Sequence, residues 1–196
     1  MKRQSSIQRR SNETEISLKL VLDGEGHANI STGIGFLNHM LVLFAFHGGF
    51  DLSLNCTGDL EVDGHHTVED IGIVLGKAFN EALGEKKGIK RYATVFLPMD
   101  ESLAMVSIDI SGRPYLHYEV PVLSPFVGDF DTQLAEEFLR AFSLHCGLTL
   151  HVKILYGHNT HHVLEAIFKA LARALREAVS RELDAGRVPS SKGILD

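Results

Sequence analysis

The sequence is poor in cysteine, in long apolar runs and in positive charge. Only two cysteines, Cys56 and Cys146, occur in 196 residues, which is too few for a disulfide framework and favours a reducing cytoplasm. No apolar run reaches the roughly 18 residues that a membrane span needs, and no apolar segment follows the basic start MKRQSSIQRR, so we expect neither a membrane span nor a secretory signal. A formal net charge of −6 gives no electrostatic reason to expect nucleic acid or an anionic membrane as partner.

Histidine, in contrast, is abundant. Apolar residues make up 44% and charged residues 22% of the chain, which is typical of a globular protein, but 11 residues are histidines. Two doublets stand out, His65-His66 and His161-His162. They are the first candidates for a functional site.

The segments around the two doublets resemble each other. Residues 64–83, GHHTVEDIGIVLGKAFNEAL, align with residues 160–179, THHVLEAIFKALARALREAV. In both segments a glutamate, Glu69 or Glu165, follows the second histidine by three residues, and a helix-period apolar pattern runs on from there. This match is the first indication of an internal repeat.

A second pair of segments repeats upstream, in the same order. Residues 39–54, HMLVLFAFHGGFDLSL, align with residues 137–152, EFLRAFSLHCGLTLHV, and this alignment pairs His39 with Glu137. Two matching blocks with a histidine doublet after each predict that the chain arose by duplication.

The expected fold follows from the apolar periods. Alternating residues predict strands and a period of 3.6 predicts helices, which we expect on one face of each sheet. The sequence therefore predicts an α+β fold of two half-repeats, residues 1–93 and 94–196, packed as one compact unit, each an antiparallel or mixed sheet with two helices. The predicted strands are 16–22, 52–56, 94–97, 103–110, 115–122 and 148–156, and the predicted helices are 33–46, 66–83, 132–144 and 161–183.

The doublets have the spacing of metal ligands. Residues three or four apart share a helix face, so each glutamate can lie beside a histidine of its doublet. Neighbouring helical residues diverge by about 100°, so the two histidines of a doublet can serve different ions. With imidazole and carboxylate donors, Mn, Fe, Co, Ni or Zn are favoured over Mg or Ca. The eight candidate ligands are His39, His65, His66, Glu69, Glu137, His161, His162 and Glu165.

Other readings remain open for these residues. Histidines at helix starts can also be caps or surface groups, and His47 and His145 are either substrate contacts or hydrogen-bonded structural histidines. Basic residues with nearby serines suit a phosphate, although each alone is typical of a solvated surface. The rival functions are a binuclear hydrolase of phosphoesters and a non-enzymatic metal store on a helical bundle.

Six segments together resemble the imidazoleglycerol-phosphate dehydratase family of histidine biosynthesis. They occur in the family's order, cover nearly the whole chain, and are far more specific together than one His-His-x-x-Glu. The segments are STGIGFLNHML (31–41), DGHHTVEDIGI (63–73), SGRPYL (111–116), GLTLHV (147–152), NTHHVLEAIFKALARALR (159–176) and PSSKGILD (189–196).

The resemblance implies a lyase that dehydrates imidazole glycerol phosphate to imidazole acetol phosphate with two Mn(II) ions, held by the eight candidate ligands. Many members have His at the position of Glu137. It also implies trimers that assemble into 24 subunits, with active sites between subunits. The residues expected at the substrate are Glu13, His39, His47, Arg91, Arg113, Lys169, Ser190, Ser191 and Lys192, and those expected in catalysis are Glu13, His65 and Glu165.

Overall fold

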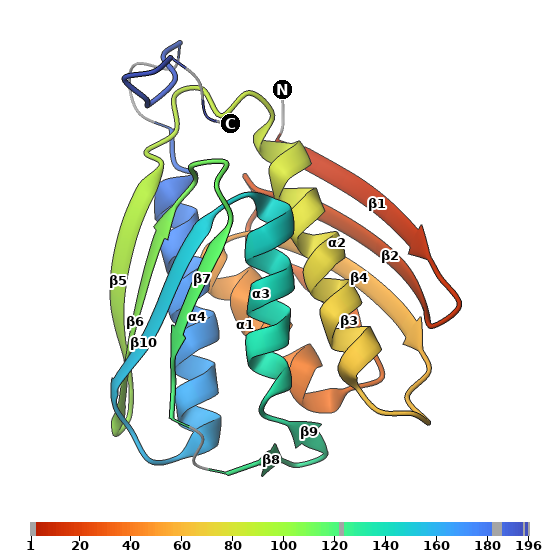
Figure 1. Cartoon of the computed structure of the whole chain (residues 1–196). Helices are drawn as coiled ribbons and strands as arrows, with labels where there is room; N and C mark the ends of the chain where they lie inside the picture. The colour runs from red at the N-terminus through yellow and green to blue at the C-terminus, as the bar shows by residue number, and fades with distance from the viewer. Residues whose placement is uncertain (1–2, 122–123, 182–185, 194, 196) are drawn as a thin grey trace.

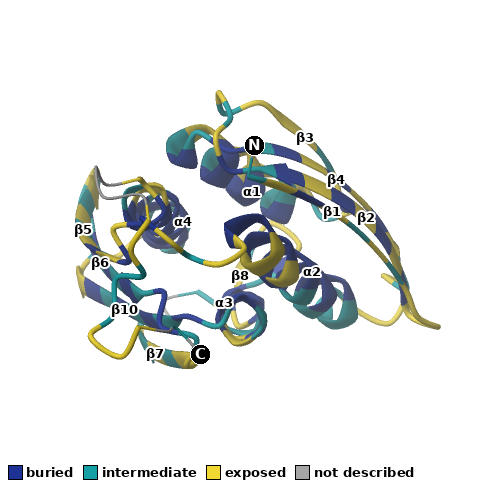
Figure 2. Cartoon of the chain, turned by 90° about the horizontal axis from the view of Figure 1, so that it is seen from above, coloured by how far each residue is buried: buried dark blue, intermediate teal, exposed yellow. Residues whose placement is uncertain are grey.

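The computed structural model describes residues 3–121, 124–181, 186–193 and 195. Two four-stranded sheets lie on the outside, and four long helices pack between them (Figure 1). Seen from above, buried stretches run along the helices and alternate with more exposed positions along the strands (Figure 2).

The first half forms one mixed sheet with two helices. Its strands are ordered β1-β2-β4-β3, with β3 parallel to β4 and the other pairs antiparallel. In chain order the elements are β1 (Gln4–Arg10), β2 (Thr14–Val21), β3 (Ala28–Ser31), α1 (Gly35–Gly48), β4 (Asp51–Gly58) and α2 (His65–Leu83).

The second half repeats this topology. Its strands are ordered β5-β6-β10-β7, again with one parallel pair, β7 and β10. The elements are β5 (Tyr92–Met99), β6 (Ser102–Asp109), β7 (Tyr115–Glu119), the hairpin β8 (Phe126–Val127) and β9 (Phe130–Asp131), α3 (Leu134–Cys146), β10 (Thr149–Tyr156) and α4 (Thr160–Ala178). The predicted α+β fold with duplicated halves is confirmed. The alternative prediction, a helical bundle that stores metal, is wrong. The division at residue 93 stays a prediction; β5 already begins at Tyr92.

Several boundaries differ from the predicted ones. The four helices lie where the apolar period placed them, but α4 ends at Ala178, and the predicted end at residue 183 lies outside the described residues. Strand β7 ends at Glu119, and its predicted end at residue 122 also lies outside them. Strand β1, QSSIQRR, was not predicted because it is polar; it is an edge strand that pairs with β2 through its backbone.

The core between the sheets joins the two halves. Phe44 of α1, Phe79 of α2 and Phe142 of α3 are fully buried. The ring centroid of Phe79 lies 5.9 Å from that of Phe44 and 5.5 Å from that of Phe142, with the rings edge to face. Because this cluster takes rings from both half-repeats, the halves share one core rather than forming separate domains.

Helices α2 and α3 approach most closely at two glycines. A Cβ atom on Gly72 would lie 2.7 Å from the carbonyl oxygen of Phe138, and one on Gly76 would lie 2.6 Å from that of Phe142. Four residues further along α2, the contacted residue also lies four residues further along α3, so the two helices run parallel. None of the described helices has the length and apolar character to cross a membrane.

We predict that Gly72→Ala destabilises the protein. The added methyl group meets backbone of α3, which cannot move without disturbing the core, so the free energy of unfolding should fall by about 1–3 kcal/mol. Urea unfolding at fixed protein concentration measures the change. Gly35→Ala, where a Cβ meets nothing within 4 Å, is the control and should leave the stability nearly unchanged. Equal effects of the two changes would contradict the close helix contact.

Candidate active site

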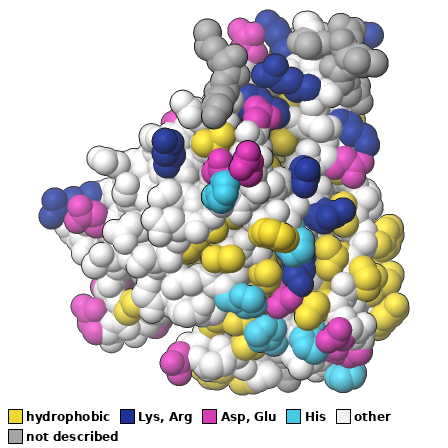
Figure 3. All heavy atoms as spheres, turned by 180° about the vertical axis from the view of Figure 1, so that it is seen from behind, with side chains coloured by type: hydrophobic (Ala, Val, Ile, Leu, Met, Phe, Trp, Pro, Cys, Tyr) yellow, Lys and Arg dark blue, Asp and Glu magenta, His cyan; other side chains and the backbone are white. Residues whose placement is uncertain are grey.

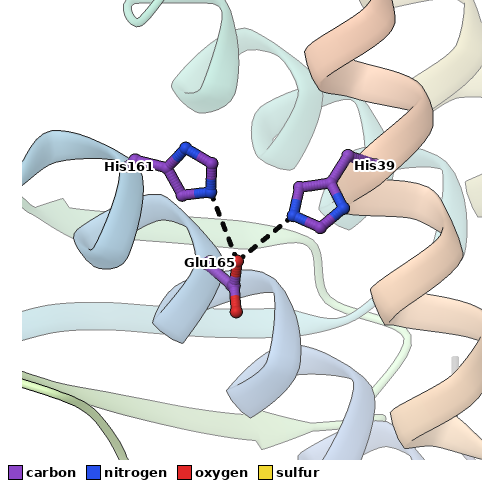
Figure 4. Close-up of side chains that lie close together, drawn as sticks. All are labelled: His39, His161 and Glu165. Atoms are coloured by element: carbon purple, nitrogen blue, oxygen red, sulfur yellow. Dashed lines mark hydrogen bonds and ion pairs between the residues drawn. The ribbon is translucent and has the colours of Figure 1, made fainter.

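Three ligand groups meet where α1 lies beside α4. The Nε2 atom of His39 lies 3.2 Å from Oε2 of Glu165, and Nε2 of His161 lies 3.4 Å from the same oxygen (Figure 4). Over the described ranges, this is the one group of three potential ligands whose donor atoms all lie within 4.8 Å of one another. Two imidazoles and a carboxylate this close have the donor types that Mn, Fe, Co, Ni or Zn prefers.

The start of α4 explains why two of these ligands share a face. The side-chain oxygen of Asn159 accepts hydrogen bonds from the backbone N–H groups of His161 (3.0 Å) and His162 (3.4 Å), so the helix begins directly before the doublet. His161 and Glu165 are then one turn apart on the same face, while His162 points elsewhere.

Glu165 is a buried charge with a partner. Its side chain is 9% exposed, and the ammonium group of Lys169, one turn further along α4, donates a hydrogen bond to Oε1. Burial raises the pKa of Glu165, but the hydrogen bonds from Lys169 and His39 outweigh it and hold the pKa below its usual range. Glu165 is therefore ionised at neutral pH, as a metal ligand must be.

The equivalent group in the first half is more open. His65 and Glu69 are one turn apart on α2, with Nε2 and Oε2 separated by 3.8 Å, and both side chains are nearly half exposed. Glu137 lies half-buried on α3, the helix that packs against α2. In the described part of the chain, Glu137 does not belong to a group of three potential ligands like the one around Glu165. The ligand role of Glu137 therefore stays a prediction.

The second histidine of each doublet is held by a carboxylate. Nδ1 of His66 lies 3.0 Å from Oδ2 of Asp59, and Nδ1 of His162 lies 2.7 Å from Oε2 of Glu101. These hydrogen bonds are the main reason why the pKa values of His66 and His162 lie above the usual range. Nε2 of each ring faces a carboxylate beyond hydrogen-bond distance, Glu13 at 3.7 Å for His66 and Asp100 at 3.8 Å for His162.

Glu13 reaches the first-half doublet from the loop between β1 and β2. Its Oε1 atom lies 3.7 Å from Nε2 of His66, and the side chain is about half exposed. The loop is fixed by two hydrogen bonds, from Glu13 N–H to Oγ of Ser11 (3.2 Å) and from Asp59 N–H to the Glu13 carbonyl (3.1 Å). The structure thus brings the predicted substrate residue Glu13 to the predicted ligand His66.

Two of the predicted phosphate-binding groups, Arg91 and the segment after Pro189, meet at the start of β5. The Arg91 guanidinium donates hydrogen bonds to both carboxylate oxygens of Asp109 (2.7 and 3.2 Å) and to the carbonyl of Pro189 (2.7 Å). Through this last contact the segment that carries Ser190, Ser191 and Lys192 is tied to Arg91. Arg113 is exposed in the turn after β6. This turn lies at the same end of the sheet as Arg91, because Ile110 N–H donates a hydrogen bond to the Arg91 carbonyl (3.1 Å).

Lys169 and His47 line a different surface, a groove of about 820 Å³ beside α4 that also contains Arg173 and Arg176. Histidine, basic and acidic side chains gather among exposed hydrophobic ones on the face seen in Figure 3. Burial, followed by the charges of Lys169 and Arg173, lowers the pKa of His47. His47 is therefore neutral at pH 7, in a groove whose cations suit an anionic ligand.

The groups expected to bind phosphate do not converge within one chain. Arg91 N–H donates to the Ala178 carbonyl at the end of α4 (2.9 Å), whereas Lys169 lies about 14 Å back along the helix axis at 1.5 Å per residue. Lys169 also reaches further away from Arg91, toward Glu165 and Met99. One phosphate cannot contact both groups in this arrangement.

A cavity of about 880 Å³ opens beside the ligands His39 and His161. Phe36 and Phe130 pack against each other in its wall, with ring centroids 5.2 Å apart, and Asp63 contributes a carboxylate. Its volume is in the range of cavities that hold small molecules. A small molecule can therefore reach His39 and His161 directly.

Sequence reasoning missed Asp59 and Glu101. Neither lies in a repeated block, and Glu101 is 61 residues from the histidine that it contacts. The only local signal is that Asp59 precedes the first doublet by a few residues in a turn-rich segment. Their role depends on tertiary contacts that no spacing rule contains.

Comparisons with known proteins agree with this architecture. A family model described as "Imidazoleglycerol-phosphate dehydratase" matches residues 32–175. Proteins of that name are 64% identical over 187 residues in Clostridium novyi (strain NT), covering 95% of each chain, and 51% identical over 195 residues in Desulforamulus reducens (strain ATCC BAA-1160 / DSM 100696 / MI-1), covering 100% of each.

Solved structures give the same result. The imidazoleglycerol-phosphate dehydratase of Staphylococcus aureus subsp. aureus N315 superposes with a TM-score of 0.83 at 45% identity, over 91% of this chain and 99% of that one. The enzyme from Pyrococcus furiosus, in complex with (S)-C348, has a TM-score of 0.83 at 37% identity, over 96% and 100%. The chain therefore belongs to the imidazoleglycerol-phosphate dehydratase family of hydro-lyases.

Proposed function

We propose that this protein dehydrates D-erythro-imidazole glycerol phosphate to imidazole acetol phosphate in the histidine biosynthesis of the cytoplasm, with two Mn(II) ions in each active site. The observation that carries the proposal is the group of His39, His161 and Glu165, whose donor atoms lie within 4.8 Å of one another in a chain of this family. The cavity beside this group has room for a small phosphorylated substrate.

The donor set fits the two proposed ions. His39, His161 and Glu165 are close together, Glu165 is ionised, and the rings of His66 and His162 each keep Nε2 available. We propose His65, Glu69 and Glu137 as the remaining ligands. Bound Mn(II) supplies a Lewis acid that polarises the substrate groups it contacts.

The protein's own residues then move protons and hold the substrate. Loss of water takes hydroxide from one carbon of the diol and a proton from its neighbour. The resulting enol then takes up a proton on carbon and gives up its hydroxyl proton to become a ketone. We assign proton transfer to Glu13, whose carboxylate lies 3.7 Å from Nε2 of His66, with His65 and Glu165 as the other catalytic groups. The Arg91 end of the sheet and the groove at Lys169 each offer cations to the phosphate.

A complete site then requires more than one copy of the chain. Because Lys169 and Arg91 do not converge within one chain, one phosphate can use both only if they come from different subunits. We therefore propose a homo-oligomer, of 24 subunits built from trimers, with active sites between subunits.

The first prediction from the proposed function concerns the reaction. The purified protein with Mn(II) should convert imidazole glycerol phosphate to imidazole acetol phosphate, which is followed as the ketone product. A dehydratase leaves the phosphoester intact, so inorganic phosphate should not be released from this substrate or from generic phosphoesters. Phosphate release without a ketone would instead indicate a binuclear hydrolase, and no product from metal-loaded protein would refute the assignment.

The second prediction concerns one ligand. His162→Ala removes the imidazole that Glu101 orients, so the bound Mn(II) per subunit should fall and turnover should drop by at least about 100-fold. Metal analysis after dialysis and the ketone assay measure the two effects. His27→Ala is the control, because His27 is 76% exposed and pairs with Asp51, which is not among the proposed ligands. Full activity and metal content in His162→Ala would remove it from the ligand set.

The third prediction concerns the shared site. Arg113→Ala and Lys169→Ala should each be nearly inactive alone. Coexpressed in equal amounts, they should regain activity in about one site in four, because some sites take Arg113 from one subunit and Lys169 from another. Ketone formation by the mixed and the separate assemblies is compared. If the coexpressed variants are as inactive as each variant alone, Arg113 and Lys169 act in sites formed by single chains.

A further inference from the structure

Glu101 is held rigidly next to the histidine doublet of the second half. It lies in the two-residue loop between β5 and β6, where Met99 pairs with Ser102. One carboxylate oxygen, Oε1, accepts hydrogen bonds from Asn159 N–H (2.9 Å) and from Oγ of Ser102 (3.0 Å). The other, Oε2, lies 2.7 Å from Nδ1 of His162. The contacts to Oε1 thus determine which oxygen faces the ring.

This geometry fixes the tautomer of His162. Oε1 of Glu101 already accepts two hydrogen bonds, and a carboxylate has no proton to donate, so Oε2 can only accept from the ring. Nδ1 of His162 must therefore carry the proton of this hydrogen bond. In the neutral ring the lone pair is then on Nε2.

In the first half, a carboxylate from a different part of the fold contacts Nδ1 of the second histidine. Oδ2 of Asp59 lies 3.0 Å from Nδ1 of His66, and Asp59 follows β4 rather than lying in the loop between β1 and β2. That loop, the counterpart of the Glu101 loop, carries Glu13, which faces Nε2 of His66 at 3.7 Å much as Asp100 faces Nε2 of His162 at 3.8 Å. The duplicated doublets are therefore oriented by carboxylates that are not themselves duplicated.

We propose that Glu101 and Asp59 are positioning residues, which keep the Nδ1–H tautomers of His162 and His66 and so present each Nε2 lone pair to a metal ion. The inference rests on the proposed metal sites. Histidines that bind metals commonly donate their other N–H to a carboxylate, and loss of that carboxylate typically weakens metal binding by about 10–100-fold.

Glu101→Gln tests the role directly. The Gln side chain keeps an oxygen for Asn159 N–H and Ser102, so its NH₂ group replaces the oxygen that faced Nδ1. A donor at that position favours the tautomer with the proton on Nε2, which cannot bind a metal. We expect the Mn(II) affinity of the metal-free protein, measured by isothermal titration calorimetry, to fall by about 10–100-fold.

Glu101→Ala separates this role from a purely structural one. Alanine leaves Nδ1 free to bond to water, so its loss of Mn(II) affinity should not exceed that of Glu101→Gln. If Glu101 only held the start of α4 through Asn159, Gln would behave like the wild type and Ala would be the weaker binder. That order of affinities would overturn the proposal.

Asp59→Leu extends the test to the first half, with Glu61→Gln as its matched control. Glu61 is an exposed carboxylate in the same loop, so its replacement should leave Mn(II) affinity unchanged, whereas Asp59→Leu should lower it by about 10–100-fold. Thermal unfolding monitored by circular dichroism establishes that each variant is folded. Unchanged affinity in a folded Asp59→Leu protein would overturn the role of Asp59.

The wild-type titration separates a failure of the proposed metal sites from a failure of the positioning role. Wild-type protein that binds no Mn(II) would refute the proposed metal sites and this role with them. Wild-type protein that binds Mn(II), with Glu101→Gln binding equally well, would refute the positioning role alone. Binding by the wild type that is weakened in Glu101→Gln and in Asp59→Leu supports both.

Discussion

The packing of four helices between two sheets determines the rest of this structure. Each sheet turns one apolar face inward, and the helices that cover it must also pack against the helices of the other half. The close contacts at Gly72 and Gly76 and the rings of Phe44, Phe79 and Phe142 fix how the two halves meet. As one consequence, His39 of α1 faces Glu165 of α4, although 126 residues separate them.

The charges in the candidate site are paired within the chain. Burying the Glu165 carboxylate is tolerated because Lys169 and His39 donate hydrogen bonds to it. Glu101 and Asp59 likewise hold the rings of the second histidines in the doublets. These carboxylates and imidazoles lie together, whereas the cationic groups at Arg91 and along the Lys169 groove lie at separate places.

Much of the fold was predictable because its signals are local. The apolar period placed all four helices, and the repeat of residues 64–83 at 160–179 predicted that the halves share one topology. The strands β1 and β3 were missed for a physical reason. Strand β1 is polar and gains its stability from backbone hydrogen bonds to β2, and β3 has only four residues, so neither shows the alternation that marks a half-buried strand.

The sequence by itself determined the family, the duplication and the donor chemistry, because histidine doublets followed by glutamate at helix starts depend only on local spacing. Only the tertiary structure decided which donors meet. It brought His39, His161 and Glu165 together while leaving His65 and Glu69 more open, and it kept Arg91 apart from Lys169. It also supplied Asp59 and Glu101, whose contacts no local pattern contains. The reason is that helix packing, rather than distance along the chain, determines which side chains become neighbours.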